Sequence, residues 1–189
     1  MSYYYEFELG KAAKILCEDL FKLKPGETII ISADTESDKR VVDATARAAF
    51  ACDAKPMVIY TAYPMGVGKA ADKMLPVEAL SAAFSETDAW VEYNNGWLLY
   101  STPYDVATAK NPKLRYLNAC GMNTDMMVRL IGRVDFPTLE EFMTHLVNLT
   151  KNAKHMRVTT PAGTDVEFDN NPDYPVNLEC GRYDVPDSH

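Results

Sequence analysis

Thr28-Ile29-Ile30-Ile31-Ser32-Ala33 is a run of apolar and β-branched residues with almost no polar interruption. Such a run is typical of a strand that is buried on both faces of a parallel sheet. A similar run, Pro56-Met57-Val58-Ile59-Tyr60, follows after a polar bend and a helical pattern that ends at Ala51. Strand, helix and strand within about 35 residues predict a βαβ unit with a right-handed crossover.

Apolar residues at helical spacing predict the helices around this unit. Residues 7–23 carry one apolar face, and Pro25-Gly26 then ends the helix. We expect Ser37 to cap the helix that runs to Ala51, and a capping box at Thr138-Leu139-Glu140-Glu141 to open a later one. Further helices are expected over 77–85, 104–109, 124–131 and 138–152, strands over 89–93 and 114–118, and a loop over 63–75.

This order of elements predicts an α/β fold, with a mostly parallel sheet flanked by helices in Rossmann-like layers. We assign residues 1–153 to that N-terminal domain. Residues 154–189 contain two short strands around the turn Ala162-Gly163-Thr164-Asp165, followed by a turn-rich end. We interpret them as the first strands of a second, β-containing catalytic domain that is truncated here.

Charge and composition limit the partners of the chain. Its 189 residues carry a formal net charge of −8, which repels phosphate backbones and anionic lipids, so we expect neither nucleic acid nor membrane as a partner. The first residues lack the basic and apolar regions of a signal peptide, and no apolar run approaches about 18 residues. A cytoplasmic location is therefore expected.

Two short motifs have some features of ligand sites. Gly66-Val67-Gly68-Lys69 resembles part of a phosphate-binding loop, but Ala70 stands where that loop needs Ser or Thr. The acidic bend Asp34-Glu36-Asp38 follows a strand, so it would suit a cation or a substrate amine. We favour the alternative that these acidic residues simply stabilise the start of a helix.

Catalytic and metal-binding patterns are not found. The three histidines are scattered, and the four cysteines form no Cys-x-x-Cys pair. The serines lie in no Gly-x-Ser-x-Gly elbow. We therefore assign no catalytic residue and no metal ligand to this segment.

Residues 94–104, here called the aromatic loop, are the strongest candidate for contact with a small molecule. The loop follows a predicted strand, and we expect Trp97, Leu99 and Tyr100 to form the wall of a substrate pocket. The alternative is a loop that covers the core or contacts a second subunit. Arg182 and Asp184, beside Gly181, are predicted to contact substrate or another domain.

Several segments resemble the N-terminal domain of the metal-dependent aminopeptidase T family. They are Leu23-Lys24-Pro25-Gly26-Glu27-Thr28-Ile29-Ile30-Ile31, the helix end Ala51-Cys52-Asp53-Ala54-Lys55-Pro56, and the capped helix with the Arg157-Val158 strand and the turn at Gly163. Asp53 stands where that family usually has Gly. The end, Gly181-Arg182-Tyr183-Asp184-Val185-Pro186, is similar to 2,5-dihydroxypyridine dioxygenases, which are iron enzymes on the same two-domain plan.

The resemblance implies that the metal ligands lie in a C-terminal domain beyond this segment. A divalent metal (Zn, Co or Fe) is expected in that missing part and none in this segment, which alone would be inactive. The resemblance also implies a homodimer, in which N-terminal domains help to enclose the site. The expected partners are thus a second subunit, the remaining C-terminal part, and a small peptide or small aromatic substrate.

Three functions follow from these expectations. The leading prediction is the N-terminal portion of a leucyl aminopeptidase-like hydrolase, in which a metal-bound water attacks the peptide carbonyl next to a free amine. The alternative is part of an Fe(II)-dependent dioxygenase that opens a dihydroxypyridine ring. A second alternative is a non-catalytic α/β module for binding or assembly, with the aromatic loop as its interface.

Overall fold

The structure is a computed structural model that describes residues 5–171 and 173–186. It separates into two compact units: the chain up to Val134 together with the segment from Arg182 onward, and Asp135–Gly181. The predicted boundary at 153/154 falls inside the second unit, since the helix before it continues directly into the hairpin after it.

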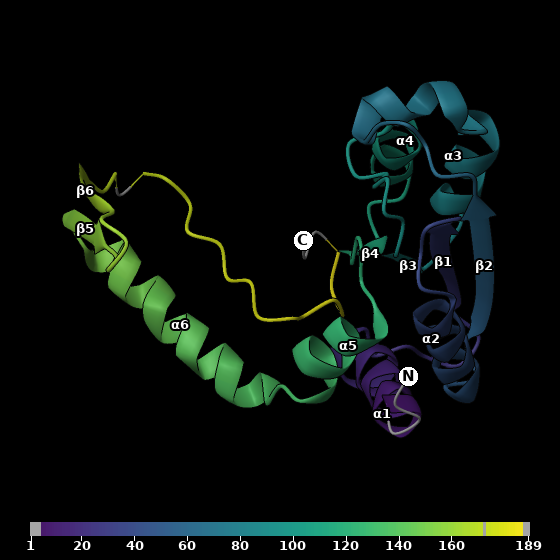
Figure 1. Ribbon diagram of the computed structural model, residues 1–189, viewed down its shortest axis with the longest axis horizontal. Coiled ribbons are helices and arrows are strands. Elements are labelled where there is room, and N and C mark those ends of the chain that lie inside the picture. The colour runs from purple at the N-terminus through teal and green to yellow at the C-terminus, as the bar shows by residue number, and fades with distance from the viewer. Residues whose placement is uncertain (1–4, 172, 187–189) are drawn as a thin grey trace. The chain divides into compact units, whose positions relative to one another are not determined.

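The first unit is built on a four-stranded parallel sheet. Its strands lie in the order β2-β1-β3-β4, with bounds β1 Thr28–Asp34, β2 Lys55–Thr61, β3 Ala89–Glu92 and β4 Arg115–Asn118 (Figure 1). Within β1, Ile30 pairs with Met57 on one side and Trp90 on the other. The predicted α/β class with a parallel sheet flanked by helices is confirmed.

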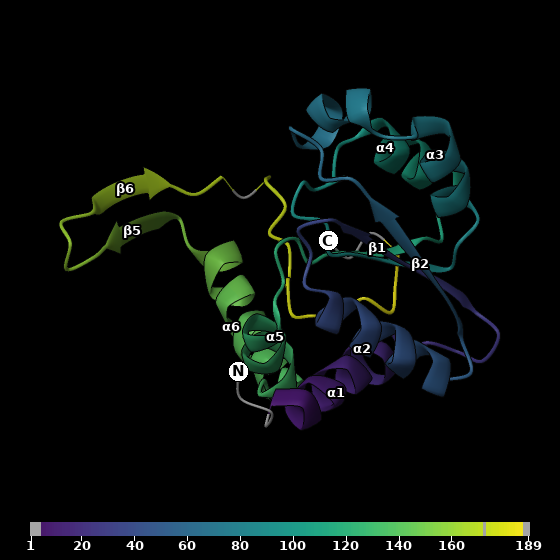
Figure 2. The same ribbon diagram turned by 45° about the vertical axis from the view of Figure 1, so that its right-hand side comes forward.

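Helices cover both faces of the sheet (Figure 2). One layer contains α1 (Tyr5–Ile15), which continues into the π-helical turn η1 (Leu16–Leu20), together with α2 (Lys39–Ala51), α5 (Thr124–Met127) and the turn η3 (Val128–Gly132). The other contains α3 (Val77–Ser85) and α4 (Thr102–Lys110), preceded in the chain by the 3-10 helix η2 (Gly68–Met74). No described helix combines the length and apolar character needed to cross a membrane.

An aromatic cluster forms the core under α3 and α4. The ring of Trp90 stacks on Phe84 with 3.9 Å between ring centroids and lies 4.6 Å from Tyr116. Its indole N–H donates to the hydroxyl of Ser32 at 2.8 Å. The only polar atom of this large side chain is therefore satisfied, so its burial is stabilising.

Two helix starts differ from the sequence prediction. Asp38, rather than Ser37, caps α2 by accepting the N–H of Arg40 at 3.0 Å. The hydroxyl of Ser37 is instead held in the loop interior, where it accepts the N–H of Asp34 at 2.9 Å. The later helix, α6 (Phe136–Asn152), begins before the predicted capping box, since Asp135 caps it and proline lies in its first turn.

The second unit consists of α6 and a hairpin. Strands β5 (His155–Thr159) and β6 (Asp165–Asp169) are antiparallel and flank Gly163, whose φ of +101° suits glycine. The guanidinium of Arg157 donates to both carboxylate oxygens of Asp165 at 2.8 Å across the strands. The two short strands predicted after residue 154 are thus present.

The two tryptophans provide a test of this core. Trp90→Ala should lower the free energy of unfolding by about 3–5 kcal/mol, since it removes a fully buried aromatic side chain. Trp97→Ala is the matched control, because Trp97 is 41% exposed. It should lower the free energy of unfolding by less than about half as much as Trp90→Ala. Urea unfolding followed by circular dichroism measures both values. Equal losses would contradict this description of the core.

Candidate functional site

The direction of the sheet places the candidate site at the carboxyl ends of β1 and β3. From β1 the chain moves outward to β2 and then returns to the other side of β1 to form β3. Open α/β sheets bind their ligands where the strand order reverses in this way. Here the loops after β1 and β3 meet at that point, and the second of them is the aromatic loop.

Asp34 joins these two loops from the end of β1. Its side chain is fully buried, and Oδ2 accepts the N–H of Gly96 at 2.8 Å. Oδ1 accepts the N–H of Glu36 at 2.9 Å and the hydroxyl of Ser37 at 3.2 Å. Both oxygens therefore have protein donors, as a buried carboxylate requires. Together with the cap formed by Asp38, this favours a structural role for the acidic bend over a cation site.

Glu92 holds the same loop from the end of β3. Its carboxyl group is fully buried and accepts the N–H of Leu98 and the hydroxyl of Tyr116, both through very short contacts. Burial raises the pKa of Glu92 to about 7, although hydrogen bonds from Tyr116, Leu98 and Leu99 oppose this shift. A side chain that loses its proton near neutral pH therefore supports the aromatic loop.

Asn94 adds a buried polar atom at the same place. Its side chain is fully buried, and its Nδ2 lies 3.5 Å from the hydroxyl of Thr61 at the end of β2. Its Oδ1 accepts no hydrogen bond from any of the described residues. Such an atom is rare among the buried polar groups of folded proteins.

The predicted wall residues lie on different sides of the aromatic loop. Trp97 is 41% exposed and Tyr100 is 66% exposed, whereas Leu99 is half-buried and packs on the core. Tyr100 has a φ of +63°, an uncommon value for a residue with a Cβ, and its ring meets Tyr104 edge-on at 6.0 Å. Two of the three side chains thus face outward, and their contact with a substrate stays a prediction.

The glycine motif at 66–69 supports this loop. The N–H of Gly68 donates to the carbonyl of Trp97 at 3.0 Å, and a Cβ at this position would lie 3.1 Å from the carbonyl oxygen of Leu99. The ammonium group of Lys69 pairs with Asp105 at 2.5 Å. Glycine is needed here for close packing of two loops, and Lys69 is engaged with α4.

Arg182 and Asp184 lie at the opposite end of the strands from the aromatic loop. Asp184 pairs with Lys22 at 2.7 Å, and Tyr183 between them donates its N–H to Leu20 at 3.0 Å. These contacts are with the segment that precedes β1, near the amino ends of the strands. The structure therefore does not bring Arg182 and Asp184 together with Trp97 and Tyr100. Their predicted role in binding stays a prediction.

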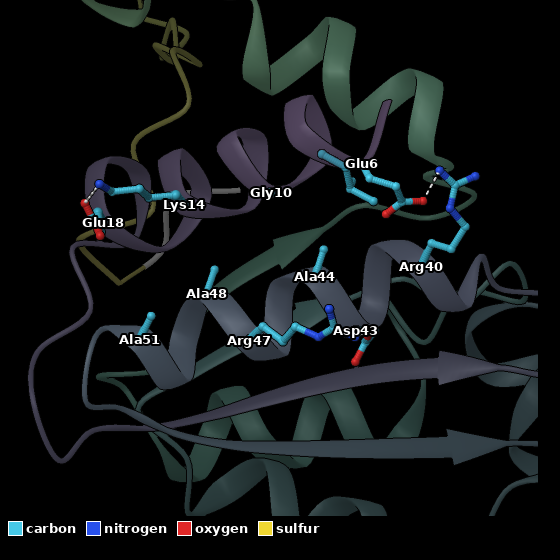
Figure 3. Close-up of a pocket in the computed structure, with 11 residues that line it drawn as sticks. Glu6, Gly10, Lys14, Glu18, Arg40, Asp43, Ala44, Arg47, Ala48 and Ala51 are labelled. Atoms are coloured by element: carbon cyan, nitrogen blue, oxygen red, sulfur yellow. Dashed lines mark ion pairs between the residues drawn. The ribbon is translucent and has the colours of Figure 1, made fainter. Parts of the chain in front are cut away.

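A hollow lies between α1 and α2 (Figure 3). It has a volume of about 440 Å³ and is rimmed by charged residues that pair with one another, Arg40 with Glu6 at 2.6 Å and Lys14 with Glu18 at 3.6 Å. Small residues, among them Gly10 and Ala48, form its floor. Because these charges are already paired, the hollow lacks the converging polar groups of a catalytic pocket.

The described residues do not fit a metal centre. Across 5–171 and 173–186, no group of three or more His, Cys, Asp and Glu side chains could hold a metal ion. His189 lies outside the described residues. No step that involves a metal is therefore assigned to these side chains.

Replacing Glu92 by Gln should change how stability depends on pH. The folded-state pKa of about 7 lies above the value of about 4.3 expected for an unfolded chain. The folded protein thus keeps a proton that the unfolded chain releases, and the stability contributed by Glu92 falls as pH rises between these values. Urea unfolding of both proteins at several pH values should show wild type losing about 1.4 kcal/mol per pH unit relative to Glu92→Gln, with no further loss above pH 7. A constant difference would show that Glu92 is ionised throughout.

Gly68→Ala tests the packing of the two loops. The new Cβ would press on the carbonyl of Leu99 in a backbone conformation that disfavours alanine, so we expect a loss of about 1–2 kcal/mol in unfolding free energy. Gly10→Ala in α1 is the control. Its Cβ would meet no atom within 4 Å, and alanine should stabilise the helix by about 0.5–1 kcal/mol. Chemical denaturation should give opposite signs, and equal signs would contradict the close approach.

Comparison with known proteins places this arrangement in a wider group. Among solved structures, the chain is similar to the 2,5-dihydroxypyridine dioxygenase from Pseudomonas putida KT2440, with 18% identity and a TM-score of 0.68 over 96% of this chain and 52% of the other. It is also similar to AmpT from Thermus thermophilus, with 14% identity and a TM-score of 0.50 over 85% of this chain and 58% of the other. The chain thus spans about half the length of these structures. Comparison with curated protein sequences gave no match.

At these low identities the two structures show the fold alone. The resemblance found in the sequence is confirmed by a family model. The NicX family model, 2,5-dihydroxypyridine 5,6-dioxygenase, matches residues 16–189. That match covers nearly the whole sequence, and the chain belongs to the 2,5-dihydroxypyridine 5,6-dioxygenase (NicX) family.

Proposed function

We propose that this chain is the N-terminal domain of a dioxygenase that opens the ring of a dihydroxylated pyridine, and that its aromatic loop forms one wall of the substrate pocket. The family match over residues 16–189 is the observation that carries this proposal. It favours the dioxygenase alternative over the aminopeptidase that the sequence placed first. The likeness to AmpT, at 14% identity, speaks for the shared fold only.

The exposed part of the aromatic loop suits a flat heteroaromatic substrate. Trp97 and Tyr100 present aromatic rings to the surface beside the carboxyl ends of the strands. Aromatic rings stack on flat ligands with little loss of side-chain freedom. Asp34 and Glu92 hold the backbone on either side of Trp97, through the N–H groups of Gly96 and Leu98, so this part of the wall is ordered before substrate binds.

The related proteins are metal-dependent enzymes, and we expect the whole enzyme to use a divalent metal, with Fe(II) as the proposed ion. In such enzymes the iron activates oxygen for ring opening. Among the described residues no group of three or more His, Cys, Asp and Glu side chains could hold that ion, and we propose that their part is to bind and orient the substrate.

The complete product of the gene distinguishes the two reactions. After reconstitution with Fe(II) in air, it should consume oxygen and remove the ring absorbance of 2,5-dihydroxypyridine. Hydrolysis of leucine p-nitroanilide by the Zn or Co form is the parallel assay for the aminopeptidase. Peptide hydrolysis without ring opening would overturn the dioxygenase proposal. The absence of both activities would favour the non-catalytic module.

Substitutions in the aromatic loop test the wall. In the complete enzyme, Trp97→Ala and Tyr100→Ala should each raise KM about 10-fold or more with a smaller change in kcat, because lost stacking weakens substrate binding. Tyr100→Gly is the matched control for the backbone, since glycine removes the ring and also relieves the positive φ. Equal KM values for the Ala and Gly variants would assign the effect to the ring. An unchanged KM in all three variants would exclude contact with substrate.

A further inference from the structure

Residues 62–67, here called the β2–η2 segment, lie along the aromatic loop. Pro64 is buried, and its Cγ lies 2.7 Å from where a Cβ would stand on Gly96. The carbonyl oxygen of Gly66 lies 3.3 Å from the same position. Gly68, at the start of η2, donates its N–H to a carbonyl of the aromatic loop at 3.0 Å. Every second residue from Pro64 onward therefore contacts the aromatic loop.

The residues between these contacts are apolar and exposed. Tyr63, Met65 and Val67 are 39%, 83% and 39% exposed. Burial thus alternates along the segment, as it does in an extended chain with one side against a neighbour. The backbone of Met65 is held in place, because its N–H donates to the sulfur of Met74 in η2 at 3.4 Å. An exposed apolar row therefore accompanies the aromatic loop.

Met65 lies closest in this row to the exposed indole of the aromatic loop. Its two neighbours in the chain, Pro64 and Gly66, both approach Gly96, which directly precedes Trp97. Methionine is among the residues most often buried, and exposed methionines are characteristic of surfaces that bind apolar partners. Its thioether also makes favourable contacts with the edges of aromatic rings. An aromatic ligand bound at Trp97 would therefore find a sulfur beside it.

The charge of this surface favours a flat neutral ligand. The β2–η2 segment and the aromatic loop contain no Asp, Glu, Lys or Arg, whereas these residues make up 24% of the chain. A peptide substrate of an aminopeptidase carries a charged amino group, which a carboxylate would stabilise. An uncharged surface of rings and a thioether instead suits a heteroaromatic ring.

We propose that Met65 is a second substrate-contacting residue, whose thioether lies against the edge of the dihydroxylated pyridine that Trp97 and Tyr100 bind. This inference rests on the proposed function, because it adds a residue to the same site. The β2–η2 segment and the aromatic loop would form two adjoining sides of the pocket, which meet at Gly96. The flexible side chain of Met65 would adapt to the substituents of the ring.

Substitution in the complete enzyme tests this contact. Met65→Ala should raise KM for 2,5-dihydroxypyridine about 3–10-fold with a smaller change in kcat, because it removes the contact between sulfur and ring. Met57→Ala is the matched control, since Met57 is 41% exposed but lies within β2, and its KM should stay at the wild-type value. Ring opening with an unchanged KM in Met65→Ala would overturn this inference and leave the proposed function standing. Absence of ring opening by wild type would overturn both.

NMR of the methionine methyl groups gives a readout that does not depend on turnover. The complete enzyme is labelled with carbon-13 at these groups and loaded with Zn, which is diamagnetic and has no redox chemistry. Adding 2,5-dihydroxypyridine should shift the Met65 signal, because a methyl group beside an aromatic ring experiences its ring current. The signal of Met57 should not move. Met65→Leu identifies the Met65 signal by its loss.

Two results of this titration would contradict the contact. A Met65 signal that moves no more than that of Met57 would overturn the proposal. A Met65 signal that differs between the 189-residue chain and the complete enzyme, but does not respond to the ring, would also overturn it. That second result would identify the rest of the enzyme as the contact of Met65.

Discussion

The buried carboxyl group of Glu92 is the constraint on which the candidate site depends. It stands at the end of β3, where it holds the N–H of Leu98 on one side and the hydroxyl of Tyr116 on the other. Placing an acid in this apolar position raises its pKa towards neutrality, which is a cost to folding at physiological pH. What the protein gains is a fixed backbone between Trp97 and Tyr100, the two rings that face outward.

A second buried carboxylate binds the same loop from the neighbouring strand. The carboxylate of Asp34, at the end of β1, accepts the N–H of Gly96. The N–H of Gly68 donates to the carbonyl of Trp97. Where the strand order reverses, hydrogen bonds from three segments therefore hold the aromatic loop. These segments are the end of β1, the loop that contains Gly68 and the end of β3. Rigidity of this kind limits the entropy that ordering would otherwise cost when a ligand binds.

Most of the fold could be predicted from the sequence, and its site only in part. β1 was recognisable from its unbroken apolar run, and the helix over 77–85 from its spacing, because burial imposes these patterns locally. Glu92 went unnoticed because a single acid after Val91 resembles the polar end of any strand, and its burial depends on Tyr116, which lies far along the chain. Ser37 and Asp38 are both good caps, and the choice between them was decided by the contact of Ser37 with Tyr93.

The return of the chain at Tyr183 has a consequence for the second unit. The ring of Tyr183 stacks on Phe21 at 5.6 Å, and its N–H binds the carbonyl of Leu20, while Arg133 on the outgoing side pairs with Glu8 of α1 at 2.8 Å. The chain therefore contacts the α1–η1 layer just before residue 135, through Arg133, and just after residue 181, through Tyr183. Closing so long a loop costs only slightly more entropy than closing a short one. Insertions between residues 135 and 181 should therefore be tolerated.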